Sequence, residues 1–114
     1  MAVLGTAGAA AYFSRRNTTY HPLVVATGLG LPSGLVMFTS TDCHRCKDAL
    51  AVARTMDVPL REVTYELESE LQERVGVIGV PLTLVIDESG ACVAQFAGQL
   101  RRSSLRRALA RVGL

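Results

Sequence analysis

Two cysteines three positions apart, Cys43 and Cys46, have the residue type and spacing that suit covalent chemistry. They lie in the stretch TSTDCHRCK (39–47), with His44 and Arg45 between them. Cysteine reacts as its thiolate, and with an ordinary pKa of about 8.5 only a few per cent of a thiol is ionised at neutral pH. By type alone, the pair is a reactive dithiol, half of a metal site, or two small residues packed in a helix.

The residues on either side place the pair where a buried strand gives way to a helix. Leu35 to Thr39 (LVMFT) is a near-continuous apolar run of strand length, as in a strand buried on both faces. We expect Asp42 to cap a helix that begins at about Cys43. Its inward stripe consists of Cys46, Ala49, Leu50, Ala53 and Met56.

This placement predicts two unequal sulfurs. The unpaired N–H groups and the positive end of the helix dipole would favour a thiolate at Cys43. His44 and Arg45 add positive charge beside it and are expected to tune its pKa, against one acidic neighbour, Asp42. Cys46 lies one turn further along, on the buried stripe. An exposed attacking sulfur and a sheltered resolving one are what thiol–disulfide exchange requires.

A metal site is the main chemical alternative. Zinc would need two more ligands beyond the two cysteines. The candidates are Cys92, His21 and His44, and none of them forms a second ligand pair. Cys92 alternates with Ala94 and Phe96 along an expected strand, so we interpret it as a small core residue. We therefore expect no metal and no bound cofactor.

The rest of the chain predicts an α/β domain with the order β-α-β-α-β-β-α from Leu35 onward. Alternating strands and helices favour a parallel central pair, and a tight hairpin at 88–90 adds an antiparallel edge. The further strands are expected at Leu23–Thr27, Leu60–Tyr65, Leu82–Asp87 and Ala91–Phe96, with helices at Leu67–Arg74 and around the inward stripe Leu105, Ala108, Leu109 and Val112.

Composition limits the class of protein. The chain has 114 residues and a net charge of +2, which fits one globular domain and indicates no nucleic-acid partner. Three cysteines are too few for a disulfide-stapled secreted scaffold. Acidic residues gather between 62 and 73, and five arginines lie between 101 and 111 without an acid among them.

The first thirteen residues, MAVLGTAGAAAYF, carry no charge and are followed by Arg15 and Arg16. They are shorter than the roughly 20 residues of a membrane-spanning helix, so they predict the end of a longer membrane helix, an interfacial anchor or a docked helix. We divide the chain into an apolar segment and linker at 1–20 and a folded domain at 21–114. Basic residues after an apolar run favour a membrane-associated protein with its domain on the cytoplasmic side. The alternatives are an extracytoplasmic or a soluble cytoplasmic protein.

Several segments together resemble the thioredoxin superfamily. LVMFTSTDCHRCK (35–47) is similar to the strand and helix start that carry its dithiol, and VGVIGVPLTLVI (75–86) to the segment with its cis-proline, which maps to Pro81. The resemblance covers Leu23 to Leu114. It implies a three-layer α/β/α sandwich around a mixed sheet of four to five strands. It also implies that Val80 and Pro81 shape a groove in which the Val80 backbone pairs with an extended substrate.

The resemblance implies a thiol–disulfide oxidoreductase that exchanges disulfides with protein substrates and a redox partner protein. Cys43 would attack and Cys46 would resolve the mixed disulfide. The chain departs from thioredoxin in having no tryptophan and in placing Met37 where a buried acid is expected beneath the dithiol. These departures leave two alternatives open: a non-enzymatic module that senses redox state or binds a partner, and metal binding through the CxxC pair.

Overall fold

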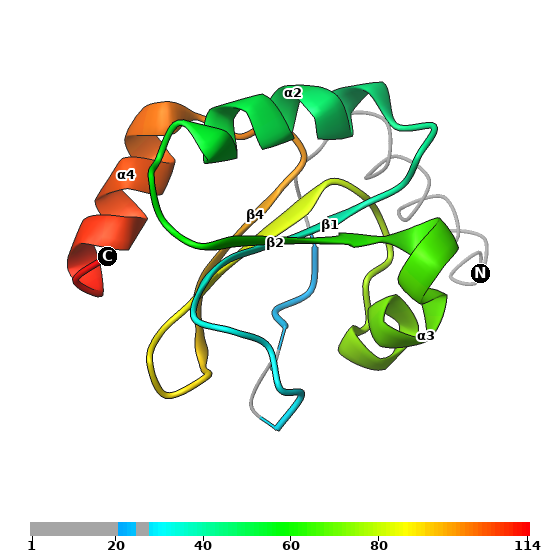
Figure 1. The fold of residues 1–114 in the computed structure, drawn as a ribbon, viewed down its shortest axis with the longest axis horizontal. Coiled ribbons are helices and arrows are strands. Elements are labelled where there is room, and N and C mark those ends of the chain that lie inside the picture. Colours follow the sequence, from blue (N-terminus) through cyan, green and yellow to red (C-terminus); the bar gives the residue numbers. More distant parts are fainter. Residues whose placement is uncertain (1–20, 25–27) are drawn as a thin grey trace, which may run out of the picture.

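Seven helices and strands follow one another in residues 21–24 and 28–114, the part of the chain that the computed structural model describes (Figure 1). The predicted order β-α-β-α-β-β-α is confirmed. Residues 1–20, the expected membrane segment and linker, lie outside the described part, as do residues 25–27. Leu23 and Val24, which were expected to begin a strand at Leu23–Thr27, are not in a strand. The elements are β1 (Gly34–Thr39), α2 (His44–Arg54), β2 (Leu60–Thr64), α3 (Tyr65–Val75), β3 (Leu82–Ile86), β4 (Cys92–Ala97) and α4 (Arg102–Arg111).

The four strands form one mixed sheet in the order β2-β1-β3-β4. The continuous apolar runs form its two central strands, β1 and β3, in which every residue is buried. The half-polar sequences LREVT and CVAQFA form its edges, β2 and β4. The sequence pattern therefore reflects how deeply each strand is buried.

The strand directions correct one expectation. The parallel pair is β1 with β2, at one edge, whereas the central pair β1 and β3 is antiparallel. Phe38, near the end of β1, pairs with Val63 near the end of β2 and with Leu82 at the start of β3. The segment that contains α3 thus brings the chain back to the end of the sheet where β1 and β2 finish. Since β3 begins at that end, it runs antiparallel to β1.

Helices cover both faces of the sheet, as the predicted three-layer sandwich requires (Figure 1). Helices α2 and α4 pack on one face, where their small and apolar residues contact the side chains of Leu35, Met37 and Val85. The other face carries the apolar cluster around Phe38, Val63 and Leu84, and Val75 at the end of α3 joins it. The predicted inward stripes are confirmed for Cys46, Ala49, Leu50 and Ala53 in α2, and for Leu105, Ala108 and Leu109 in α4. Met56 and Val112, the last residues of the two predicted stripes, lie beyond the helix ends and are half-buried against the same cluster.

Cys92 does not share a face with its expected neighbours. The register of β3 and β4 shifts at a bulge: Val85 pairs with Ala94, but Ile86 pairs with Cys92. The extra residue turns Cys92 toward the Phe38 cluster, while Ala94 packs on the α2–α4 side. The alternation of Cys92 with Ala94 and Phe96 predicted from the sequence is therefore wrong, because a bulge interrupts the period of two.

Candidate functional site

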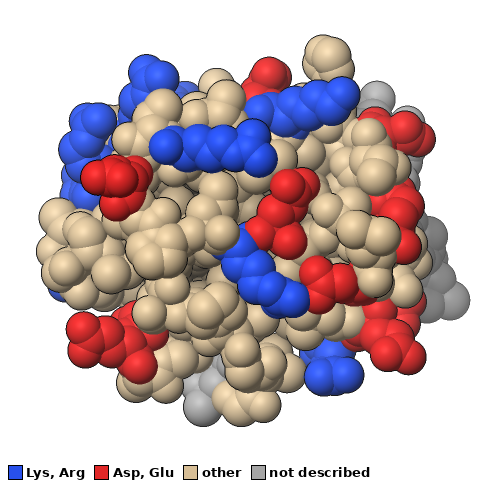
Figure 2. All heavy atoms as spheres, in the orientation of Figure 1, with Lys and Arg blue, Asp and Glu red and all other residues tan. Residues whose placement is uncertain are grey.

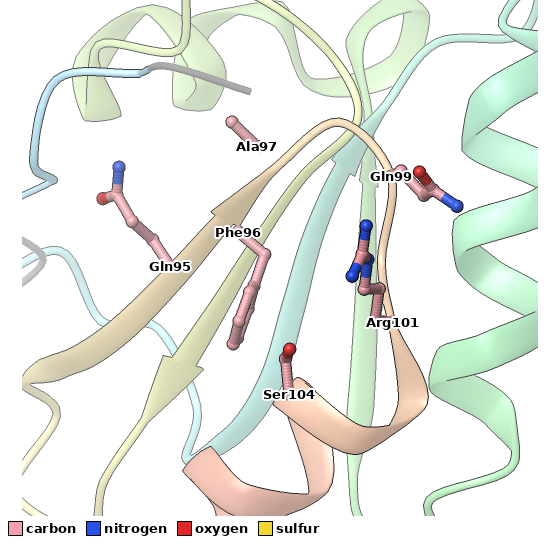
Figure 3. A pocket seen from close by; sticks show the side chains of 6 residues that line it. All are labelled: Gln95, Phe96, Ala97, Gln99, Arg101 and Ser104. Atoms are coloured by element: carbon pink, nitrogen blue, oxygen red, sulfur yellow. The ribbon is translucent and has the colours of Figure 1, made fainter. Parts of the chain in front are cut away.

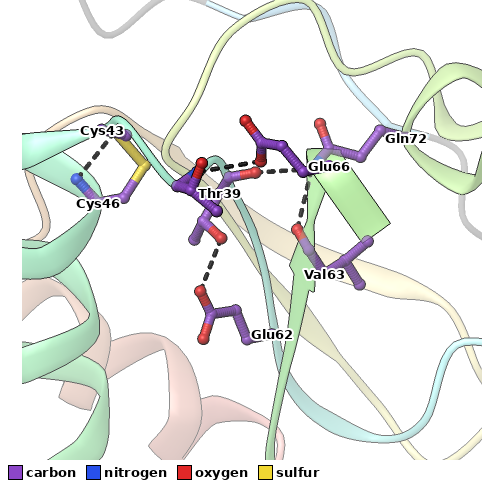
Figure 4. The surroundings of a disulfide bond; sticks show 8 residues. Thr39, Cys43, Cys46, Glu62, Val63, Glu66 and Gln72 are labelled. Atoms are coloured by element: carbon purple, nitrogen blue, oxygen red, sulfur yellow. Dashed lines mark hydrogen bonds between the residues drawn. A yellow bond between two sulfur atoms is a disulfide. The ribbon is translucent and has the colours of Figure 1, made fainter. Parts of the chain in front are cut away.

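A disulfide joins Cys43 and Cys46 at the start of α2, with their Cα atoms 5.2 Å apart (Figure 4). The two residues are unequally buried. Cys43 is half-buried, whereas Cys46 is only 2% exposed and lies on the inward face of the helix. Cys43 is therefore the more accessible residue of the pair.

Cys43 itself, and not Asp42, is the residue that caps α2. Its backbone is extended, with φ −103° and ψ 106°, and its Sγ accepts a hydrogen bond from the Cys46 N–H at 3.0 Å (Figure 4). The expectation that Asp42 caps the helix is therefore wrong by one residue. A sulfur in the capping position meets the N–H groups that have no partner within the helix. In the reduced protein these groups favour a thiolate at Cys43.

The turn before Cys43 is fixed by contacts that sequence reasoning missed. The Cys43 N–H donates to the Ser40 carbonyl at 3.3 Å. The Thr41 N–H donates to Oε1 of Glu66, in the first turn of α3, at 3.0 Å. This backbone hydrogen bond lowers the pKa of the Glu66 carboxyl below its usual value. No local pattern reveals the contact, because the partners are far apart in the sequence.

A buried amide joins the two strands that end below the disulfide. Gln72 donates from Nε2 to the carbonyls of Thr39 at 3.0 Å and Val63 at 2.9 Å (Figure 4). On the other side, the buried Thr39 hydroxyl donates to the Glu62 carboxylate at 2.7 Å. These bonds hold the ends of β1 and β2 rigidly in place, and β1 leads directly into the turn that carries Cys43.

The segment before β3 reaches the same end of the sheet. Its Val80–Pro81 peptide bond is cis. A cavity of about 200 Å³ lies between this segment, the turn before the disulfide and α3; it is lined by Ser40, Tyr65, Gln72, Val77, Ile78, Gly79 and Val80. Because Phe38 pairs with Leu82, the residues after β1 and those before β3 are neighbours. We call the cavity the groove; Val80 lines it, and the next residue, Pro81, is buried.

The two residues between the cysteines, His44 and Arg45, are exposed on the first turn of α2. Met37, the position where the resemblance implies an acid, is fully buried under α2 with Ala49 and Leu50. No ionisable side chain therefore occupies that point of the core. The Glu62 carboxylate lies on the same side of the sheet, two residues before the end of β2.

The other candidate metal ligands are engaged elsewhere. The ring nitrogens of His21 bond to Pro22 and Ile78, and the Cys92 thiol donates to the Ala94 carbonyl at 3.3 Å. Burial raises the pKa of the Cys92 thiol. Within residues 21–24 and 28–114, no three His, Cys, Asp or Glu side chains are placed to hold a metal ion.

A second hollow, of about 400 Å³, lies between β4 and the start of α4 (Figure 3). Its lining combines amide side chains, one hydroxyl and one guanidinium, and contains no cysteine: Gln95, Phe96, Ala97, Gln99, Arg101 and Ser104. Unlike the groove, it is not bordered by the turn that leads to Cys43. No helix in the described part of the chain is long and apolar enough to cross a bilayer.

Comparison with known proteins gives matches by structure. No protein-family model matches the sequence, and a sequence search of curated proteins also gives no match. Thio-disulfide isomerase from Thermus thermophilus superposes with a TM-score of 0.61 at 22% identity, covering 80% of this chain and 92% of that one. Thioredoxin from Malassezia sympodialis gives 0.59 at 17%, covering 83% and 98%, and thioredoxin 1 from Thermosipho africanus gives 0.58 at 18%, covering 68% and 91%. With its mixed four-stranded sheet and its CxxC pair at the start of α2, the chain has the thioredoxin fold.

Proposed function

We propose that the protein is a thiol–disulfide oxidoreductase that exchanges disulfides with protein substrates and with a redox partner protein. The observation that carries this proposal is the inequality of the two sulfurs at the start of α2. Cys43 is half-buried and caps the helix, whereas Cys46 is 2% exposed within bonding distance of it. The isomerase and thioredoxins that share the fold support the general class of reaction.

The chemistry needs no cofactor. In the reduced protein the Cys43 thiolate attacks one sulfur of a substrate disulfide, forming a mixed disulfide and releasing the other substrate sulfur as a thiolate. The Cys46 thiolate then attacks Cys43 Sγ, which forms the Cys43–Cys46 disulfide and releases the second substrate thiolate. The substrate gains two electrons and the protein loses two. In the opposite direction the same steps oxidise a dithiol.

His44 and Arg45 tune this pair in our proposal. Both are exposed on the first turn of α2, next to the sulfur that ionises. Positive charge there stabilises the thiolate of the reduced form and has no comparable effect on the neutral disulfide. The disulfide is therefore more oxidising than it would be without them.

Val80 and Pro81 form the substrate side of the proposed site. Val80 lines the groove beside the turn that leads to Cys43, and the buried Pro81 follows it in the chain. An extended substrate segment would pair with the Val80 backbone, and its disulfide would then lie over Cys43. The exposed apolar side chains of Tyr65 and Ile78 at the groove suit apolar residues of that segment.

Three single substitutions test the proposal on a disulfide-bonded peptide. Cys43→Ser should abolish exchange, and Cys46→Ser should accumulate a mixed disulfide that mass spectrometry detects. Cys92→Ser is the matched control and should retain full activity, because that thiol packs against the Phe38 cluster, on the face of the sheet opposite α2. Full exchange by Cys43→Ser would refute the proposal.

A redox-dependent binding module is the second candidate, favoured by Met37. An apolar side chain under the dithiol supplies no group to move a proton to or from Cys46. A pair that forms its disulfide reversibly, exchanges slowly with every peptide, and changes a partner's affinity on reduction would support this function instead.

We also propose that the protein works at a membrane surface, with its domain on the cytoplasmic side. Every arginine of α4 is exposed, and Figure 2 shows basic side chains over α4 and α2, with acidic ones along the opposite side, over α3. A juxtamembrane arginine contributes about 1 kcal/mol to binding an anionic bilayer. The uncharged segment at 1–13 would add apolar contact. Changing the five arginines between 101 and 111 to glutamine should reduce flotation with anionic vesicles, and unchanged flotation would refute the role of α4.

A further inference from the structure

His21 is a buried histidine outside the dithiol chemistry. Its side chain and backbone together are 7% exposed. Its Nε2 lies 3.0 Å from the backbone nitrogen of Ile78, and its Nδ1 lies 2.8 Å from the Pro22 carbonyl oxygen. Since the Ile78 N–H can only donate, Nε2 is the acceptor. The ring hydrogen is then on Nδ1, where the carbonyl accepts it.

Residues 21–24 are also hydrogen-bonded to the edge strand β4. Gln95 of β4 donates from Nε2 to the carbonyls of His21 at 3.0 Å and Pro22 at 3.1 Å. Its Oε1 accepts the Val24 N–H at 2.9 Å, and the Val24 side chain is buried in the Phe38 cluster. Residues 21–24, which we call the clasp, therefore bridge β4 and Ile78 across more than fifty positions of sequence.

The clasp holds a residue that lines the groove. Ile78 presents a side chain that is 56% exposed at the groove, two positions before Val80. Its neighbour Val77 is anchored by an N–H that donates to the Gln72 carbonyl at 2.9 Å. Beyond the groove, the Pro81 carbonyl accepts the Gly98 N–H at 2.9 Å. The histidine thus fixes the backbone between these two anchors.

We propose that His21 is a positioning residue for substrate binding: its Nε2 holds Ile78 and Val80 in the arrangement that receives an extended peptide. The inference rests on the proposed function, because it assigns substrate binding to the groove. It predicts that substitution of His21 affects a peptide disulfide and a small disulfide differently. Loss of the histidine acceptor weakens binding of a peptide disulfide, while the reaction of Cys43 with a small disulfide that does not enter the groove stays the same.

The test compares three variants in full-length protein. His21→Leu removes the acceptor and keeps an apolar side chain, and it should raise KM for a disulfide-bonded peptide about fivefold, as expected for one net hydrogen bond. Its kcat and its rate with cystamine should not change. His21→Gln places an amide oxygen where Nε2 lies and should restore KM. Val24→Ala is the matched control, since it loosens the same clasp without removing the acceptor.

The outcomes separate this inference from the proposed function. Wild-type KM in His21→Leu, or an equal rise in Val24→Ala, overturns the positioning role while exchange itself stands. If the unaltered protein exchanges with neither disulfide, the proposed function fails first. In that case, amide hydrogen exchange at Ile78 in the unaltered protein still tests the hydrogen bond to His21. The same measurement serves if His21→Leu does not fold. Protection of that amide supports the hydrogen bond, and exchange at the rate of an unstructured peptide overturns it.

Discussion

Replacing Arg45 by glutamine should make the reduction potential of the Cys43–Cys46 pair more negative. Arg45 lies on the first turn of α2, next to the sulfur that caps the helix. Its charge stabilises the thiolate of the reduced form and leaves the neutral disulfide almost unaffected. Without that charge the disulfide is relatively more stable, so a more reducing buffer is needed to open it.

The size of the shift follows from the exposure of Arg45. Solvent screens an exposed pair, whose interaction is typically worth about 0.2–1 kcal/mol. For a two-electron couple 30 mV corresponds to about 1.4 kcal/mol, so the potential should fall by about 4–20 mV. The equilibrium constant with glutathione then changes by up to about fivefold.

Arg54→Gln is the matched control. Arg54 is the last residue of the same helix and is also exposed, so both substitutions make the same chemical change in the same element. It lies about 15 Å along the axis from the start of α2. This exceeds the screening length of about 8 Å at physiological salt. The control should leave the potential unchanged.

The assay equilibrates each protein with glutathione buffers, quenches with acid and counts free thiols by labelling. It is repeated at low and high salt, and the shift caused by Arg45→Gln should shrink as salt rises. An equal shift in Arg54→Gln, or a potential that rises in Arg45→Gln, would refute the electrostatic reasoning.

Three further outcomes follow from the core and from the pKa shifts. Burial raises the pKa of the Cys92 thiol above its usual value, so alkylation of Cys92 should be slow at pH 8 and should speed up about tenfold per pH unit toward that raised pKa. Mass spectrometry of a protein whose other two cysteines are in the disulfide measures this, and fast labelling at pH 8 would contradict it. Hydrogen bonds from Ser89 and from the Ala91 N–H lower the pKa of Asp87 below 3.8, so this carboxylate contributes stability above that pH and loses it as pH falls through the lowered value. Asp87→Ala should therefore lower the melting temperature at pH 7, with a difference that vanishes in acid; a difference that persists there would show another cause. Leu105 is fully buried between α4 and the sheet, and Leu105→Ala should lower the free energy of unfolding by about 2–5 kcal/mol in urea titrations, a larger loss than an exposed alanine substitution in α4 gives.

The dithiol site could be located from the sequence because its signals are local. A continuous apolar run predicts β1, and the period of the following residues predicts the buried stripe of α2 that contains Cys46. The spacing of the cysteines then allows a disulfide within the first turn. Each of these properties depends on residues within a few positions of one another, so pattern and propensity suffice to predict them.

The capping residue and the face of Cys92 show where local patterns fail. An acid next to a helix start predicts a cap at Asp42, yet the chain turns so that the Cys43 sulfur takes that place. The strict alternation expected for β4 ends at the bulge opposite Val85 and Ile86. The first outcome depends on a shift of one residue in the helix start, and the second on a shift of one residue in the strand pairing. Propensities do not resolve differences of this size.

The sequence by itself determined the order of strands and helices from Leu35 onward, and that the two cysteines lie at a helix start. Only the tertiary structure decided that β3 runs against β1, that Glu66 holds the turn before Cys43, and that His21 reaches Ile78. Periodicity arises from neighbours along one element, so it indicates where strands and helices form. A hydrogen bond between residues fifty positions apart leaves no periodic trace, because it exists only after the chain has closed the loop between them.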